Sequence, residues 1–370
     1  MSTQLTSAPG AGRHAVFHEL RVSAIEPLTD DSVAISFAVP AELREAYAFV
    51  QGQHLSLRCT VAGDDVRRTY SISTPAGSGT LRIGVKRLPG GVFSGYAHSR
   101  LRVGDPIEVM TPTGGFHVPL DPAASRRYAA VAAGSGITPI LSIIATTLEV
   151  EPRSDVVLIL GNRTAQSVMF LEDLADLKNR YLPRLAIHHV LSREPQESDL
   201  LSGRIDAEKM RRFLDLLLPA GPVHEWFLCG PEPMIDGCRA VLIESGIAPG
   251  RIHSELFHVE GSAARPEVTA QPVPSGAPDA AVTVILDGRG SMFTMARDGE
   301  VILDAALRVR GDAPYSCKSG VCGTCRAKLV QGRVRMDRCH ALEPPEVDAG
   351  FVLACQSRPV SDSVTLDFDA

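Results

Sequence analysis

Five of the eight cysteines fall within 39 residues near the C-terminal end of the chain. Cys317, Cys322 and Cys325 have the spacing C-x4-C-x2-C, and Cys355 follows after 29 further residues. Four thiolates at this spacing predict a [2Fe–2S] cluster, in which a short loop supplies three ligands and a distant segment the fourth. Zinc is the weaker alternative, because zinc sites favour paired C-x2-C motifs and only Cys322 and Cys325 form one.

Glycines and a spare cysteine accompany these ligands. Gly320 and Gly323 lie inside the loop CKSGVCGTC, where the missing Cβ allows backbone N–H groups to point at the sulfurs. Cys339 is expected to be a free thiol near the surface. As a fourth ligand it would leave a gap of only 13 residues after Cys325.

Residues 68–71 have the pattern R-x-Y-S within a run rich in strand formers. Alternation along a strand puts Arg68 and Tyr70 on one face. The tyrosine can then lie against a flavin ring and the arginine can meet a phosphate, while Ser71 can bond a ring heteroatom. An ordinary strand with a surface arginine and a half-buried tyrosine is the alternative interpretation.

Two further motifs support the flavin. The segment VKRLPGGVFSGY contains Lys86, a glycine turn that includes Gly91, and Ser94 at the start of a predicted helix. A glycine turn that leads into a helix N-terminus is an anion site suited to a pyrophosphate. TPTGGF at 111–116 then closes the region, and the GGVFS segment resembles an FAD-type pyrophosphate loop, which favours FAD over FMN. We expect Lys86, Gly91 and Ser94 to contribute to its binding.

A different glycine turn predicts a nicotinamide site. Gly134, Ser135 and Gly136 follow an apolar strand and lead through Thr138 and Pro139 into a helix. The motif is not the G-x-G-x-x-G of a dinucleotide-binding unit. Pro139 fits a first helical turn. Ser135 and the glycine amides can cradle a pyrophosphate at that helix N-terminus.

Cys229 and Gly230 begin the motif C-G-P-x-x-M after the strand-like run EWFL. A thiol at this point lies at the carboxyl edge of a parallel sheet, where such sheets bind ligands. A buried apolar thiol is the alternative, since most free cysteines are buried.

Two arginines bear on the choice of nucleotide. Arg163 follows the second predicted strand of the parallel sheet and Arg193 follows the third, and no acidic residue occupies 162–168. An arginine at such a strand end suits a ribose 2′-phosphate, whereas an acidic residue suits a free 2′-hydroxyl. The sequence therefore favours NADPH over NADH. The alternative is that both arginines line a solvated edge.

These motifs must be positioned by at least three folded regions. A chain of 370 residues is long enough to form them. Six short strand-like runs predict a six-stranded antiparallel flavin barrel at 15–122. Alternating apolar strands and amphipathic helices predict a parallel α/β nucleotide-binding domain at 123–259. A linker with four prolines is expected at 260–280, and a [2Fe–2S] domain at 281–370.

The composition indicates where the protein is located and which classes of partner it lacks. The net charge is −6, and the sequence has no run rich in lysine and arginine, so no nucleic-acid partner is expected. The uncharged stretch 128–148 is interrupted by glycine and proline, so we expect a strand, a turn and a helix and no membrane span. Without an apolar signal segment, a cytoplasmic location is expected.

The order of the motifs resembles the ferredoxin–NADP reductase superfamily, joined to a C-terminal domain that resembles plant-type ferredoxins. The resemblance implies a β-grasp fold at the C-terminus, and a catalytic Thr138 near the flavin. It also implies a catalytic Cys229 that approaches the nicotinamide, and Glu255 and Phe257 at the flavin border. A place in the apolar core is the alternative for Phe257. Electrons would pass from NADPH through FAD to the cluster, because a flavin converts between two-electron and one-electron transfer.

Within that superfamily the chain is similar to the reductase subunits of phenylacetyl-CoA epoxidase complexes. The segments that carry this similarity are LTDDSVAISFAVP, AAGSGITPILSII, GNRT, HHVLSRE and WFLCGPEPM. The similarity implies a di-iron oxygenase as the partner. A reductase of a Rieske-type or other multicomponent hydroxylase is one alternative. A redox sensor is another, although it would need a globin-like or DNA-binding domain for which no residues remain.

Overall fold

The computed structural model describes residues 16–218, 222–257 and 279–370. The described residues divide into two compact units, one within 17–257 and the other within 279–370. The expected linker at 260–280 lies almost entirely outside the described residues, and Ala280 already belongs to a strand.

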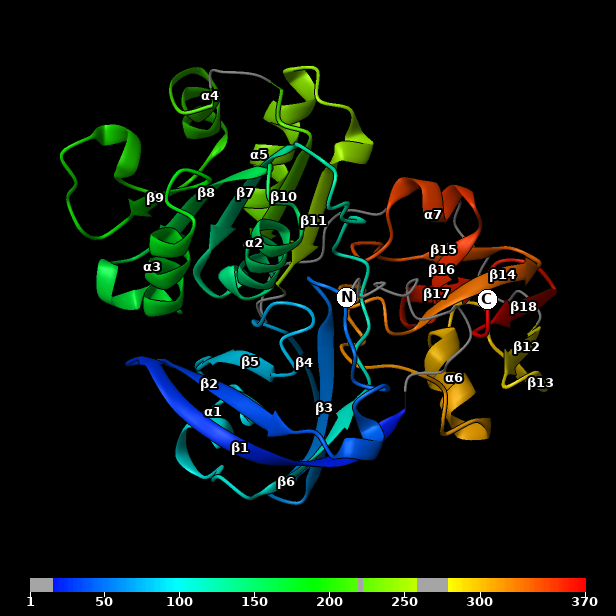
Figure 1. Cartoon of the computed structure of the whole chain (residues 1–370). Helices are drawn as coiled ribbons and strands as arrows, with labels where there is room; N and C mark the ends of the chain where they lie inside the picture. The colour runs from blue at the N-terminus through cyan, green and yellow to red at the C-terminus, as the bar shows by residue number, and fades with distance from the viewer. Residues whose placement is uncertain (1–15, 219–221, 258–278) are drawn as a thin grey trace. The chain divides into compact units, whose positions relative to one another are not determined.

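The first unit begins with an antiparallel sheet of six strands in the order β4-β3-β6-β1-β2-β5, as predicted. The outer strands β4 and β5 approach one another through a bridge between Ile72 and Ile83, which curls the sheet into an open barrel (Figure 1). One helix, α1, follows β5. The bounds are β1 Phe17–Thr29, β2 Ser32–Ala38, β3 His54–Val61, β4 Asp64–Ser71, β5 Leu81–Lys86, α1 Val92–Ser99 and β6 Pro106–Met110.

A parallel sheet of five strands completes this unit, in the order β11-β10-β7-β8-β9. The strand order reverses between β7 and β10, and open parallel sheets bind ligands at the carboxyl ends of the strands at such a point. The bounds are β7 Arg127–Ala133, α2 Ile137–Val150, β8 Asp155–Asn162, α3 Leu171–Arg180, β9 Leu185–Leu191, α4 Ala207–Leu216, β10 Glu225–Gly230, α5 Glu232–Glu244 and β11 Ile252–Leu256.

The helices cover both faces of the parallel sheet. Residues of α2 and α3 form one apolar cluster with one face, and residues of α4 and α5 form a second cluster with the other. The uncharged stretch 128–148 becomes β7, a turn and most of α2, as expected. Within the described ranges, no helix has both the length and the apolar character needed to cross a membrane.

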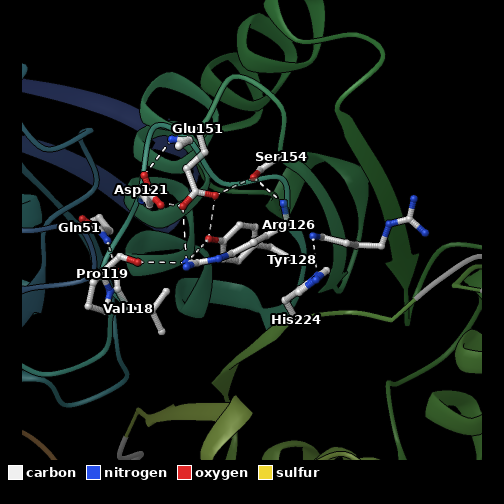
Figure 2. A network of polar contacts seen from close by, with 11 residues as sticks. Gln51, Val118, Pro119, Asp121, Arg126, Tyr128, Glu151, Ser154 and His224 are labelled. Atoms are coloured by element: carbon white, nitrogen blue, oxygen red, sulfur yellow. Dashed lines mark hydrogen bonds and ion pairs between the residues drawn. The ribbon is translucent and has the colours of Figure 1, made fainter.

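A buried carboxylate fixes the connection between barrel and parallel sheet. Glu151 follows α2 and is fully buried. It accepts hydrogen bonds from the Tyr128 hydroxyl (2.9 Å), the Ser154 hydroxyl (2.6 Å) and the Asp121 N–H (2.9 Å), and Arg126 lies 3.6 Å away (Figure 2). Because a buried carboxylate is stable only when its oxygens are hydrogen-bonded, this network holds the connecting segment at the amino end of the sheet.

The second unit contains a mixed sheet in the order β13-β12-β18-β14-β16, with β12 and β18 parallel and the other pairs antiparallel. Helix α6 packs into its core. This is the arrangement that the β-grasp prediction requires. The bounds are β12 Ala280–Leu286, β13 Arg289–Met295, α6 Ile302–Val309, β14 Arg326–Gln331, β15 Val334–Met336, α7 Pro344–Asp348, β16 Phe351–Leu353, β17 Ser357–Pro359 and β18 Ser363–Asp367.

Candidate functional site

The two nucleotide motifs of the sequence meet where the strand order reverses. The turn Gly134–Gly136 follows β7, and Cys229 and Gly230 end the neighbouring strand β10. A Cβ on Gly136 would lie 2.2 Å from the carbonyl oxygen of Cys229, so only glycine allows this backbone approach. A Cβ on Gly230 would lie 2.8 Å from Met234 Cε, the movable end of the methionine side chain in the C-G-P-x-x-M motif.

The side chains next to this turn are held by a hydrogen bond and by burial. The buried Thr138 hydroxyl donates to the carbonyl oxygen of Ser135 at 2.9 Å and closes the turn ahead of α2. Cys229 is fully buried, and burial, followed by the nearby charge of Glu255, raises the pKa of its thiol well above the ordinary value. Cys229 is therefore a neutral thiol at neutral pH.

Replacing Gly136 by alanine tests this approach of β7 and β10. Since the new methyl group has no room against the Cys229 carbonyl, we expect a loss of about 1–3 kcal/mol in the free energy of unfolding, with weakened nucleotide binding. Denaturant unfolding followed by the fluorescence of the single tryptophan, Trp226 in β10, measures it. Gly250→Ala is the control, because a Cβ there meets nothing within 4 Å. Equal stability of both variants would contradict the packing argument.

A carboxyl group joins the parallel sheet to the barrel. Glu255 on β11 pairs in register with Cys229, and the hydroxyl of Ser71 on β4 donates to Glu255 Oε2 at 3.2 Å. Burial raises the pKa of Glu255 to about 7, and the hydrogen bond from Ser71 opposes this rise. Ser71, Cys229 and Glu255 thus converge on one buried region between the flavin motif and the nicotinamide motif.

The other barrel residues of the flavin prediction lie on or near β4 and α1. The ring of Tyr70 packs 5.4 Å from that of Phe93, and burial raises the pKa of the Tyr70 hydroxyl. Arg68, half-buried, donates to the carbonyl of Arg67 at 2.8 Å. The aromatic ring next to a cationic side chain fits one face and one phosphate of a flavin nucleotide.

The turn ahead of α1 has the geometry of an anion site. Gly91 is its N-cap residue, and a Cβ there would lie 2.4 Å from Ser94 Oγ. The Ser94 hydroxyl accepts from the Leu88 N–H at 3.1 Å, so it shapes the turn. The first hydrogen bond of the helix runs from the Gly95 N–H to the Gly91 carbonyl, which leaves earlier N–H groups for a pyrophosphate.

Lys86 and Arg163, predicted to bind different cofactors, share one carboxylate. Lys86 Nζ lies 3.3 Å from Asp31 Oδ1, and Arg163 Nη2 lies 2.7 Å from Asp31 Oδ2. The Arg193 N–H donates to the Arg163 carbonyl at 2.8 Å, which brings the loops after β8 and β9 together. Glu194 from the second loop accepts from the Ala165 N–H at 2.8 Å. The acidic side chain of Glu194 therefore reaches the end of β8. It comes from the loop after β9, outside the segment 162–168 in which the sequence shows no acidic residue.

The four predicted cluster ligands come together in the second unit as two pairs of thiols. Hydrogen bonding links Cys317 with Cys322 and Cys325 with Cys355, and it lowers the pKa of Cys317, to about 5, and that of Cys355. In the described part of the chain, no three or more His, Cys, Asp or Glu side chains surround a single metal position. Two pairs suit two irons, each of which takes two thiolates, better than one tetrahedral zinc.

The loop around these thiols supports them with N–H groups, as predicted. Gly320 and Gly323 have φ values of +79° and +68°, a region that favours glycine. The Ser319 N–H lies 3.4 Å from Cys317 Sγ, and the Gly320 N–H hydrogen-bonds Cys355 and lowers its pKa. Donors of this kind stabilise thiolates, so the loop fits a cluster.

Comparison with protein families and known proteins agrees with this geometry. Residues 19–118 match an oxidoreductase FAD-binding domain, residues 130–240 an oxidoreductase NAD-binding domain, and residues 284–360 a 2Fe-2S iron-sulfur cluster binding domain. The chain is 46% identical to one of the subunits of the 1,2-phenylacetyl-CoA epoxidase of Escherichia coli (strain K12), over 96% of this chain and 98% of that protein. It is 33% identical to the ferredoxin reductase component of 3-ketosteroid-9-alpha-monooxygenase of Rhodococcus rhodochrous, over 94% and 96% of the two chains.

The chain belongs to this family of oxygenase reductase components. Among solved structures, phthalate dioxygenase reductase superposes with a TM-score of 0.58 and 25% identity, and the match covers 95% of this chain and 98% of that one. An intact type IV self-sufficient cytochrome P450 monooxygenase superposes with a TM-score of 0.66 and 24% identity over 95% of this chain and 41% of that one, which shows the shared fold.

As a reductase component, the chain is an NAD(P)H-dependent flavin oxidoreductase with FAD and a [2Fe–2S] cluster. The predictions of FAD and of the cluster are confirmed. The predicted site residues do not include His54 and Asp31, although both contact predicted site residues or Glu255. His54 lies directly opposite Ser71 on the neighbouring strand. Only the pairing register of β3 and β4 reveals this position.

Proposed function

We propose that this chain is the electron-donating subunit of a phenylacetyl-CoA epoxidase complex, with a di-iron oxygenase as its partner. The observation that carries the proposal is the 46% identity over 98% of the E. coli epoxidase protein, against 33% for the 3-ketosteroid monooxygenase component. A cytoplasmic location is part of the proposal. None of the eight cysteines, four of them predicted cluster ligands, forms a disulfide, which supports it because oxidising compartments favour disulfides.

The site residues receive the following roles. FAD, when bound, would supply the conversion between two-electron hydride transfer and one-electron transfer. The amides of Gly134, Ser135 and Gly136 bind the nicotinamide pyrophosphate, and Thr138 holds that turn. The neutral thiol of Cys229 packs at the point of hydride exchange, where it excludes water. Ser71 and Glu255 hold a proton beside it.

The barrel and the cluster domain supply the remaining roles. Arg68 and the turn from Gly91 to Ser94 bind the flavin phosphates, Tyr70 stacks on the flavin, and Lys86 adds positive charge near that turn. Cys317, Cys322, Cys325 and Cys355 would supply the four thiolates that hold the two irons.

Exchange of oxygenase components tests the partner. The purified chain is mixed with NADPH and the oxygenase subunits of the E. coli epoxidase, and consumption of phenylacetyl-CoA is measured. The same assay is run with the oxygenase of the Rhodococcus 3-ketosteroid monooxygenase and its steroid substrate. We expect turnover with the first and little with the second. Preferential support of the steroid oxygenase would contradict the proposed partner.

We further propose NADPH as the electron donor, supported by the two arginines at the ends of β8 and β9. Neutralising Arg163 or Arg193 is expected to raise the NADPH KM by one to two orders of magnitude, or about 1.4–2.8 kcal/mol, and to change NADH use little. Steady-state kinetics with both nucleotides measure it. Arg211→Ala is the control, since Arg211 pairs with Glu244 between α4 and α5. A parallel loss for both nucleotides would assign the arginines another role, such as the Asp31 contact of Arg163.

A further inference from the structure

The carboxyl group of Glu255 lies between two side chains that project from a directly opposed pair of strand residues. His54 on β3 and Ser71 on β4 are partners in the antiparallel register, so both project from the same face. Ser71 Oγ lies 3.2 Å from Glu255 Oε2, and His54 Nδ1 lies 3.9 Å from Glu255 Oε1. Each carboxyl oxygen therefore faces one side chain of the pair.

The nitrogen that faces Glu255 has no hydrogen-bond partner. The side chain of His54 is 2% exposed, and its buried Nδ1 is unsatisfied among the described residues. The other ring nitrogen, Nε2, lies 3.2 Å from Thr113 Oγ1. A Cβ on Gly114 would lie 2.8 Å from Nδ1, so this glycine keeps the space beside that nitrogen open. Buried polar groups without partners are rare, and this one points at a carboxyl group.

A neutral ring and the contact of Nε2 with Thr113 together allow Nδ1 to be a donor. Burial lowers the pKa of His54 to about 4, so the ring is neutral at neutral pH. A neutral imidazole carries one proton, and the nitrogen that accepts a hydrogen bond cannot carry it. When Thr113 donates to Nε2, the proton is on Nδ1 and faces Glu255.

Other charged or titratable neighbours do not supply this interaction. Cys229 on β10 is a neutral thiol, and His253 on β11 lies 2.9 Å from Glu225 and stacks on Phe227. No lysine or arginine in the described part of the chain forms an ion pair with Glu255. The ionised form of this carboxyl group therefore depends on neutral donors.

We propose that His54 is a positioning residue for Glu255: its Nδ1–H donates to Oε1 of the ionised carboxylate while Ser71 donates to Oε2, and Thr113 fixes the required tautomer. The separation of 3.9 Å has to shorten by about 1 Å to reach a hydrogen bond. The chain Thr113–His54–Glu255–Ser71 sets the orientation and the proton affinity of the carboxyl group. Its meaning for hydride exchange rests on the proposed function, but the interaction itself does not.

The test is an infrared pH titration of the full-length, flavin-loaded protein. The carbonyl band of protonated Glu255 is assigned by its loss in Glu255→Gln, and its pH dependence gives the pKa. Because a donor to the charged form is lost, His54→Phe should raise this pKa by about one unit, a tenfold gain in proton affinity. Thr113→Val should shift it in the same direction by less, and His54→Gln, which retains an N–H donor, should restore it in part.

A matched control and a kinetic measurement separate this role from a structural one. His18→Asn removes another barrel histidine, one that contacts Tyr47, and should leave the pKa of Glu255 unchanged. An unchanged pKa in both His54→Phe and Thr113→Val, or an equal shift in His18→Asn, would overturn the proposal. If His54→Phe loses its flavin, the pKa of Glu255 in Thr113→Val tests the proposal, because that variant keeps the imidazole.

Hydride transfer from NADPH distinguishes a failure of this proposal from a failure of the proposed function. In single-turnover kinetics, the inflection of the pH profile should move with the pKa of Glu255, while the affinity for NADPH stays the same. If the infrared pKa of Glu255 shifts but the kinetic pH profile does not, His54 positions Glu255 as proposed, and Glu255 has no part in hydride exchange.

Discussion

Replacing Cys355 by serine is expected to remove the cluster, whereas replacing Cys339 leaves it in place. Cys355 is buried and hydrogen-bonded with Cys325, so its loss takes one of two thiolates from one iron. The fall in metal affinity should exceed the roughly 10- to 100-fold that loss of an outer partner of a metal ligand costs. Iron analysis and the visible spectrum of the purified variant measure the occupancy.

Cys339→Ser is the matched control because both residues are cysteines of the same domain. Cys339 is half-buried, and its thiol interacts with the backbone of Leu342 and with Glu346, not with any of the four predicted ligands. We expect this variant to keep its iron and to lose at most about 1 kcal/mol of stability. Equal iron loss in the two variants would overturn the assignment of the fourth ligand.

Contiguous motifs are the part of the site that the sequence predicts well. C-x4-C-x2-C, the Gly134–Gly136 turn and C-G-P-x-x-M each encode a local backbone shape, and glycine at a position with no room for a Cβ is visible in the sequence. The six-stranded barrel and the parallel sheet are predictable for a similar reason, because apolar periodicity and turn residues recur in every element.

Contacts between elements are the part that the sequence leaves open. Alternation places Tyr70 and Arg68 on one face of β4, but it does not say that His54 lies opposite Ser71. Nor does it say that Asp31, in the turn after β1, reaches both Lys86 and Arg163. Each of these contacts depends on strand register and on the packing of the barrel against the parallel sheet, and both are properties of the folded chain.

The Asp31 contacts also change how the arginine prediction is understood. The sequence pattern predicts a ribose phosphate beside Arg163, yet its guanidinium already has a carboxylate partner at 2.7 Å. A phosphate at this position would have to compete with Asp31. Arg193 is exposed, and its side chain is the more available of the two for a 2′-phosphate. We therefore expect the larger change in NADPH selectivity from Arg193.

A chain that ends at residue 262 should fold, bind FAD and oxidise NADPH with ferricyanide, but should fail to reduce cytochrome c. The apolar clusters of the described residues support independent folding, because three are built entirely from residues before 262 and the fourth entirely from residues after 280. The shortened chain also matches the first compact unit. Flavin content, thermal unfolding and the two acceptor assays measure the outcome.

The two acceptors separate hydride exchange from the one-electron outlet. Ferricyanide can take electrons at the flavin, so its reduction should proceed at a rate close to that of the full chain. Reduction of cytochrome c should fall by about 100-fold or more, equivalent to roughly 2.7 kcal/mol in activation free energy, since Cys317, Cys322, Cys325 and Cys355 are gone. The full-length variant Cys339→Ser keeps all four of these cysteines, so it serves as the positive control. Cytochrome c reduction by the shortened chain at the full rate would show that electrons leave without the cluster, and the route through these four cysteines would have to be abandoned.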